Sequence, residues 1–437
     1  MFNSRHKSLL NQSALYALSI FLMKGISLVM LPIYTHYLTP EDYGRLEILV
    51  VFSNITSLVL SFGLVDALYR FVGLADNITK KRHHASECLL IAGIISITSF
   101  ILFYCYSGNL SGFFPGKITE NEVFLLGITL SIDGLINIPL AWLRITERAT
   151  SFFLISMLKV LIQVSLTFYL LVQGWGITSI LVAGIVSSSV VAIILCIIQL
   201  KETRFSFSIT NLRSIFTYAW PILIGGTATF SLSGLDTWIL AKHFGAADIA
   251  AYAVAIKFSL VPAVLIQPFT LWWLPKRFSV LNEPNGQKIN AHFAMIGATI
   301  SVIICAILGL ISPILIHYLT PIEYHSASKI IPWLLICSLL KMLSDLLNLG
   351  CFVKKDSRLQ MKINIAACTL GAALLFILVP PFMVTGALVS LIIANLIRTW
   401  LIYYFSQQQV YLPYKFDYFY LALFAAITLT WLGQIII

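Results

Sequence analysis

Ionisable side chains interrupt stretches of sequence that are otherwise almost wholly apolar. Five of them are cations and four are acids: Lys24, Arg45, Lys159, Lys257 and Lys341, and Glu47, Asp133, Asp236 and Asp345. A charge near the centre of a bilayer costs about 2.5–3.5 kcal/mol on insertion scales, so such residues face a partner or a water-filled cavity. We expect them to line a central cavity, where an excess of cations suits an anionic substrate such as a lipid diphosphate. The four acids are candidates for binding or exchanging a coupling ion.

Simpler interpretations of the same charges stay open. Lys341 and Asp345 are four residues apart on one helix face, so they can form a mutual ion pair that only lowers the cost of each. Lys159 and Lys257 lie close enough to a predicted helix end to extend their ammonium groups toward water, whereas Lys24 lies about mid-helix. Asp133 and Asp236, the strongest candidates for ion coupling, can also be structural partners of nearby lysines.

The composition indicates which elements position these residues. The chain has 437 residues, of which 59% are hydrophobic and 11% are charged, and its mean hydropathy is +0.91. Soluble domains have about 45–50% apolar and roughly 25% charged residues. The difference excludes a soluble enzyme, a disordered chain and a secreted disulfide scaffold. The sequence predicts an all-α polytopic membrane protein.

Apolar runs bounded by charged or turn residues predict the individual spans. Twelve core spans and a thirteenth candidate are expected at 10–31, 45–66, 86–106, 122–143, 151–172, 177–199, 215–238, 250–274, 291–316, 329–351, 360–379, 383–405 and 417–436. These runs are about twice the length of a barrel strand and apolar throughout, so helices are favoured over a β-barrel. Pro262 and Pro268 are expected to kink the eighth span, and the 220–226 region is a candidate hinge in the seventh.

The distribution of basic residues predicts the orientation. If the N-terminus is cytoplasmic, 19 Lys and Arg fall in cytoplasmic loops and only Lys117, Lys242 and Lys329 fall outside. Basic residues favour the cytoplasmic side, so we expect a cytoplasmic N-terminus. The net charge of +10 then has a topological explanation, and nucleic-acid binding is not expected.

The 200–214 connection divides the chain between its sixth and seventh spans. We expect an N-terminal lobe at 1–199, a cytoplasmic inter-lobe loop at 200–214, a C-terminal lobe at 215–405 and a tail at 406–437. No nucleotide-binding P-loop, catalytic constellation, metal motif or other cofactor site is recognisable, and the seven cysteines are scattered. The sequence favours a transporter over an enzyme.

One stretch carries a family signature: LPIYTHYLTPEDYGRLEILVVFSNITSLVLSFGLVDALYRFV, at 31–72. It resembles the N-terminal signature of bacterial polysaccharide-export flippases through Leu38, Pro40, Glu41, Asp42, Tyr43, Gly44, Gly63, Leu64, Ala67 and Arg70. LRITERA at 143–149 and LDTWILAKHFGAADIAAYAVAIKFS at 235–259 are similar to the same family, although Ala251 stands where the family usually has Gly. The chain resembles Wzx-type O-antigen flippases of the multidrug/oligosaccharidyl-lipid/polysaccharide exporter superfamily.

That resemblance implies two six-helix lobes around a central cavity, in the inner membrane. It implies flipping of an undecaprenyl-diphosphate-linked oligosaccharide from the cytoplasmic to the periplasmic leaflet. Its implied partners are membrane lipid, a polysaccharide polymerase and a chain-length regulator. In related lipid II flippases, basic residues of spans one and eight and an acid of span two line the cavity; by position these are Lys24, Lys257 and Glu47. A multidrug antiporter of the same superfamily is the alternative, and a polysaccharide polymerase is disfavoured because the chain lacks a long outer loop.

Overall fold

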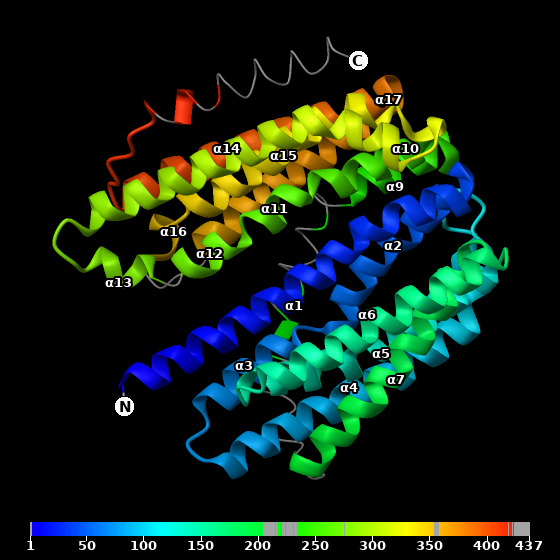
Figure 1. The fold of residues 1–437 in the computed structure, drawn as a ribbon, viewed down its shortest axis with the longest axis horizontal. Helices are drawn as coiled ribbons and strands as arrows, with labels where there is room; N and C mark the ends of the chain where they lie inside the picture. Colours follow the sequence, from blue (N-terminus) through cyan, green and yellow to red (C-terminus); the bar gives the residue numbers. More distant parts are fainter. Residues whose placement is uncertain are drawn as a thin grey trace. The chain divides into compact units, whose positions relative to one another are not determined.

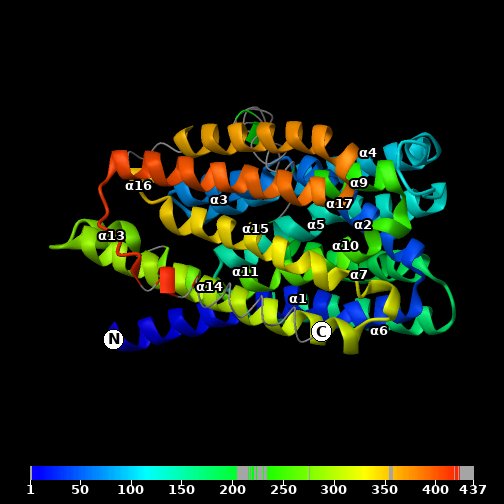
Figure 2. The ribbon, with the colours of Figure 1, turned by 90° about the horizontal axis from the view of Figure 1, so that it is seen from above.

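All regular structure in the described part of the chain is helical, which confirms the predicted fold class. The computed structural model describes residues 2–203, 234–274, 276–353 and 358–417, with isolated positions between 215 and 230 and between 419 and 423. The chain divides into two compact units, Met1–Thr227 and Ala228–Ile437, shown from two directions in Figures 1 and 2.

The first unit is built around α5. Its helices are α1 (Phe2–Tyr37), α2 (Pro40–Ser61), α3 (Leu64–Leu74), α4 (Ile78–Ser111), α5 (Glu120–Ile145), α6 (Ala149–Val172) and α7 (Ile177–Thr203). α5 packs against α4 and α7 along most of its length, and also against α2 and α3. Leu68, Cys88, Ile138 and Trp142 are buried together in one apolar cluster where α3, α4 and α5 meet.

The second unit is built around α15. Its helices are α9 (Leu235–Phe244), α10 (Ala246–Ser259), α11 (Val261–Leu265), α12 (Gln267–Trp273), α13 (Arg277–Leu281), α14 (Gly286–Leu319), the 3-10 helix η1 (Ile322–Tyr324), α15 (Ala327–Leu347), α16 (Gly350–Val353) and α17 (Arg358–Gln409). α15 packs against α10, α14 and α17.

Side-chain caps fix where several of these helices begin. Thr39 accepts a hydrogen bond from the Asp42 amide at 3.1 Å, and Asn77 accepts one from the Lys80 amide at 2.8 Å. Thr119 and Glu122 form a reciprocal capping box at the start of α5. Such caps satisfy amides that have no partner within the helix, which is needed wherever a helix begins near lipid.

The helices confirm that this is a multi-pass membrane protein. Nine helices of the described residues are long and apolar enough to cross a membrane. Most predicted spans fall inside one helix each, as with 86–106 in α4 and 291–316 in α14. The predicted seventh span, the thirteenth span, the 220–226 hinge and the 200–214 loop lie mostly outside the described residues.

Three predicted spans differ from the helices observed. The run at 45–66 is broken because Phe62 and Gly63 both adopt left-handed backbone, with φ of 45° and 65°, which ends α2 and starts α3. The run at 329–351 ends at Leu347 and resumes as α16. The run at 250–274 is three helices, and Pro262 and Pro268 each stand at the start of a new one, which confirms the expected kinks.

The helix α17 combines the predicted spans 360–379 and 383–405. Its backbone leaves the helical region at Met383, where φ is 52°. Arg398 donates to Asn364 across this break at 2.9 Å, although a straight helix would hold them about 50 Å apart at 1.5 Å per residue. The chain therefore reverses, and Figure 2 shows the two halves of α17 alongside one another.

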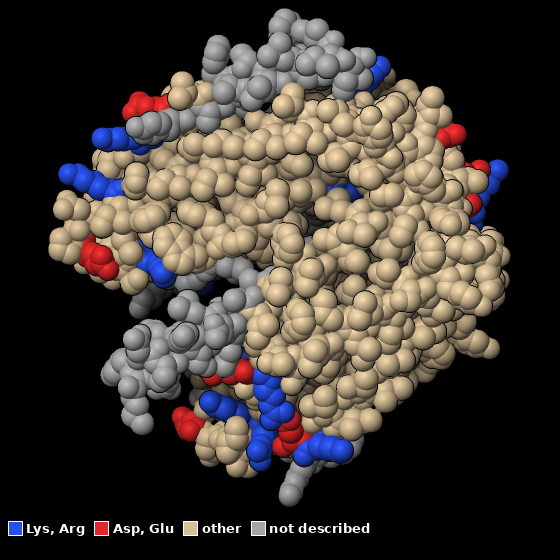
Figure 3. Space-filling model, viewed as in Figure 1, with Lys and Arg blue, Asp and Glu red and all other residues tan. Residues whose placement is uncertain are grey.

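The surface of each unit fits a lipid environment. Ile97, Tyr104, Leu161, Ile193 and Ile377 all lie within long helices and are more than half exposed. Figure 3 shows broad uncharged surfaces over the helices, with Lys, Arg, Asp and Glu gathered toward the helix ends. An apolar exterior of this extent is typical of helices that face acyl chains.

The reversal in α17 leads to a prediction about stability. A Cβ atom at Gly386 would lie 2.1 Å from the Leu378 carbonyl oxygen, a backbone atom that cannot move aside easily. Gly386→Ala should therefore destabilise the protein by about 1–3 kcal/mol, the usual cost of overpacking. The expected result is a lower midpoint of thermal unfolding in detergent. Gly93→Ala is the control, because nothing lies within 4 Å of a Cβ there; equal midpoints for the two variants would contradict the prediction.

Candidate functional site

Arg45 forms a clamp between two helices of the first unit. Its Nη2 atom donates to both carboxylate oxygens of Glu122 at 2.6 Å, and its Nη1 atom donates to Asp42 at 3.3 Å. Glu122 also accepts from the Thr119 amide at 2.8 Å as part of the capping box. An arginine–carboxylate pair of this kind fixes the relative position of the two side chains and also balances their charges. The clamp ties the start of α2 to the start of α5, and two acids balance the Arg45 charge.

Glu47 lies two residues further along α2 and is buried, with 6% of its surface exposed. Tyr34 of α1 lies close enough to interact with it electrostatically. The predicted role of Glu47, lining a cavity with residues of the first span, stays a prediction. Lys24 also belongs to α1, but its side chain lies outside the part of the structure that is described.

Asp133 and Lys159 are brought together in the first unit, from α5 and α6. The two charges attract each other, and Ser57 of α2 donates to Asp133 Oδ2 at 3.2 Å. A small cavity of about 10 Å³ lies between Asp133 and the break that separates α2 from α3. Space of this size holds about one water molecule. Asp133 is half-buried. It lies beside the polar break where α2 ends and α3 begins.

Asp236 is the most deeply buried acid of the second unit among the predicted site residues. It lies in the first turn of α9 with 4% of its surface exposed, and the Tyr252 hydroxyl of α10 donates to its Oδ2 atom. The backbone amides of Asp236 and Thr237 also interact with this carboxylate. Asp236 is therefore a buried acid whose described polar contacts come from a tyrosine and the backbone, with no cation among them. Lys257 lies in the last turn of the neighbouring α10 and is half-buried.

Asp345 is paired across helices and not only along its own. Arg398 of α17 lies 3.9 Å from Asp345, while the Lys341 side chain is exposed and acts on Asp345 only electrostatically. Arg277 adds a third cation, because its Nη1 atom donates to Asn348 at 2.7 Å and to the Asp345 carbonyl at 3.4 Å. Burial lowers the pKa of the Arg277 guanidinium and Asp345 opposes that effect, so the residue stays charged.

Four charged residues of these clusters were not among the predicted site residues: Asp42, Glu122, Arg277 and Arg398. Arg398 carried a usable signal, because it is a cation within the apolar run 383–405. Glu122 and Arg277 resemble ordinary residues at a helix boundary and in a loop. Within the described ranges, no group of three or more His, Cys, Asp or Glu residues is placed to hold a metal ion.

The predicted site residues therefore form separate clusters, and each is described within its own unit. Lys24, Arg45, Glu47, Asp133 and Lys159 belong to the first unit, and Asp236, Lys257, Lys341 and Asp345 belong to the second. The clusters share one chemistry, since each places charge on apolar helices close to a compensating group or polar side chain.

Comparisons with known proteins agree with this chemistry. The family model described as "Polysaccharide biosynthesis protein" matches residues 33–270, more than half of the chain. No curated protein matches the sequence.

Solved structures share the fold at low sequence identity. A lipid II flippase, MurJ, in an inward closed conformation matches with a TM-score of 0.77 and 13% identity, over 96% of this chain and 92% of that chain. An inward-facing multidrug resistance transporter of the MATE family and MOP superfamily has a TM-score of 0.63 and 15% identity, over 89% and 94% of the two chains. A mutant of the Vibrio cholerae MATE transporter VcmN has a TM-score of 0.60 and 14% identity, over 93% and 97%.

The resemblance at 31–72 and 235–259 is thus confirmed at the level of family and fold. The helices described above have the same fold as MurJ and the MATE transporters, and the family match concerns polysaccharide biosynthesis. The chain belongs to the polysaccharide biosynthesis protein family.

Proposed function

We propose that the chain flips an undecaprenyl-diphosphate-linked oligosaccharide, an O-antigen repeat unit or a similar glycan, from the cytoplasmic to the periplasmic leaflet of the bacterial inner membrane. The observation that carries the proposal is the match of residues 33–270 to a polysaccharide biosynthesis family, in a chain folded like a lipid II flippase. An alternating-access mechanism would move the headgroup while the lipid tail stays in the membrane.

The charges explain how such a substrate could cross. A diphosphate moved into apolar surroundings without compensation is very costly. Ammonium groups of Lys24 and Lys257, in the first and second spans of their lobes, would lower that cost, with Lys159 and Lys341 as further cations. Arg45 contributes less to substrate binding in this scheme, because Glu122 and Asp42 already balance its charge.

A multidrug antiporter is the second candidate, and the fold shared with MATE transporters favours it. The two functions differ in substrate charge, because cationic drugs are disfavoured by a cavity with an excess of fixed cations. The family match and the lysine positions support the flippase. In the cell, the proposed flippase would work alongside a polysaccharide polymerase and a chain-length regulator.

The first prediction of this proposal concerns the two central lysines. Lys24→Ala or Lys257→Ala should reduce O-antigen display at least about tenfold, since an uncompensated charge costs about 2.5–3.5 kcal/mol in the membrane. Lys→Arg at either position should retain part of the activity, because the charge is kept. The measurement is the O-antigen ladder on a lipopolysaccharide gel, in a flippase-deleted host that carries each variant at equal membrane levels.

The controls are Lys80→Ala in the first unit and Lys329→Ala in the second, both exposed lysines at helix starts. They should give ladders like those of the parent protein. Wild-type ladders from both Lys24→Ala and Lys257→Ala would reject the cationic cavity. Efflux of cationic drugs by a parent protein that fails to restore the ladder would favour the antiporter.

A second prediction tests the orientation. With a cytoplasmic N-terminus, a cysteine placed at Ser206 in the 200–214 loop should be protected from an impermeant thiol reagent in intact cells. A cysteine placed at Ser111, at the end of α4, should react. The background must lack native cysteines, since Cys105 is exposed. Labelling at Ser206 together with protection at Ser111 would show that the orientation is the reverse of the predicted one.

A third prediction concerns energy coupling. Asp133 and Asp236 are the acids that we propose to exchange the coupling ion, with Glu47 and Asp345 as the other candidates. The burial of Asp236, with 4% of its surface exposed, supports this role. Asp236→Asn should abolish gradient-driven transport in proteoliposomes, whereas Asp248→Asn, an exposed acid in the first turn of α10, should leave it intact. Transport by the parent protein that persists after proton and sodium gradients are collapsed would refute ion coupling.

A further inference from the structure

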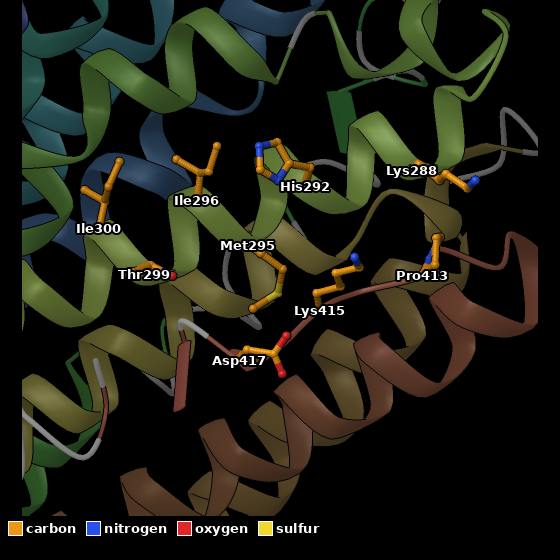
Figure 4. Close-up of a pocket in the computed structure, with 9 residues that line it drawn as sticks. All are labelled: Lys288, His292, Met295, Ile296, Thr299, Ile300, Pro413, Lys415 and Asp417. Carbon is orange, nitrogen blue, oxygen red and sulfur yellow. The ribbon is translucent and has the colours of Figure 1, made fainter. Parts of the chain in front are cut away.

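A large cavity in the second unit lies between α14 and the segment that follows α17. Its volume is about 800 Å³, within the range of roughly 300–1,000 Å³ that ligand sites occupy. Figure 4 shows its described lining: one row of side chains from α14, with Lys415 and Asp417 of the C-terminal segment beside it. None of these residues belongs to the clusters proposed for substrate transport.

The α14 wall changes from polar to apolar along the helix. Lys288 and His292 lie in the first two turns, and Ile296 and Ile300 follow on the same face. At 1.5 Å per residue, Lys288 and Ile300 are about 18 Å apart along the helix axis. A wall of this length extends from the predicted cytoplasmic surface well into the hydrocarbon layer.

The opposite wall is held in place by specific contacts. The Gln407 side chain bonds both backbone groups of Leu412 at 2.9 Å, which fixes the turn after α17. Leu412 is buried against Ala291 of α14 and Leu349. This anchoring positions Lys415 at the polar end of the cavity, so both lysines stand where a lipid headgroup would lie.

A second cavity adjoins the first. It has a volume of about 310 Å³, is almost entirely apolar, and is lined by residues of α14, α15 and α17 that include Leu343 and Trp400. Met295 lines both cavities, and a flexible methionine is a wall that can adapt to an apolar chain. The pair of cavities thus offers a charged compartment next to an apolar one.

We propose that these cavities bind a resident anionic glycerophospholipid, with its phosphate between Lys288 and Lys415 and an acyl chain along Ile296 and Ile300. The charges of Lys288, Lys415 and Asp417 sum to +1. That charge balances the single negative charge of a phosphodiester such as phosphatidylglycerol. The same three side chains would leave part of the charge of a diphosphate unbalanced, which distinguishes this site from one built for the transported substrate. Basic pockets beside membrane helices are a known way to hold anionic headgroups.

The test is a binding titration of the purified full-length protein by native mass spectrometry. Phosphatidylglycerol should bind more tightly than phosphatidylethanolamine with the same acyl chains. Each lysine should account for about a fivefold preference, the weight of one basic residue near an anionic membrane surface. Lys288→Ala combined with Lys415→Ala should remove most of the preference, and Lys329→Ala, which lies away from the cavity, should keep it.

A second variant tests the cavity without changing its charge. Thr299→Trp fills the apolar end of the cavity, beside Ile300, and should weaken phosphatidylglycerol binding, whereas Ile307→Trp, exposed two turns further along α14, should not. Equal binding of the two phospholipids to the parent protein would overturn the proposal, as would unchanged binding to Thr299→Trp. A polyprenyl monophosphate that binds more tightly than phosphatidylglycerol would assign the cavity to the substrate lipid instead. These readouts do not depend on transport, so they can fail while the flippase proposal stands.

Discussion

The cost of placing a charge or an unpaired backbone group in hydrocarbon is the constraint on which this structure depends. Four of the ionisable residues described above have a compensating group: Glu122 for Arg45, Lys159 for Asp133, Tyr252 for Asp236 and Arg398 for Asp345. The helix caps meet the same requirement for the backbone. Thr39, Asn77 and Thr119 accept hydrogen bonds from amides that would otherwise be unpaired. A membrane protein can keep polar groups only where the fold supplies their partners.

The breaks in the long helices follow from the same argument. α2 ends at two residues in left-handed backbone, and Ser57, Ser61 and Asp133 gather beside that break around space for about one water molecule. Pro262 and Pro268 divide the eighth predicted span at residues whose missing amides begin new helices. A break of this kind is tolerated where polar groups lie near it, so these points combine local flexibility of the chain with charge.

The sequence predicts the helices well and their polar partners poorly. Long apolar runs such as 86–106 identify helices because hydrophobicity alone decides whether a segment can enter the membrane. Proline marks the kinks for an equally local reason. The partners depend on tertiary packing: Arg45 meets Glu122 from 77 positions away, and Asp345 contacts Arg398 as well as responding to Lys341 in its own helix. The break at Phe62 also could not be predicted, because phenylalanine is not a residue type that indicates left-handed backbone.

The chemistry of arginine and lysine bears on the proposed transport. Four arginines of the described residues are held by directed hydrogen bonds: Arg45 to Glu122, Arg277 to Asn348, Arg398 to Asn364 and Arg148 to Glu202. A planar guanidinium forms several bonds in fixed geometry, so it suits a permanent tie between helices. A lysine ammonium is a point charge on a flexible stem with fewer directed bonds. In the flippase that we propose, the substrate must be released on the far side of the membrane, so lysines suit the transport path better than arginines, whose directed bonds suit the scaffold.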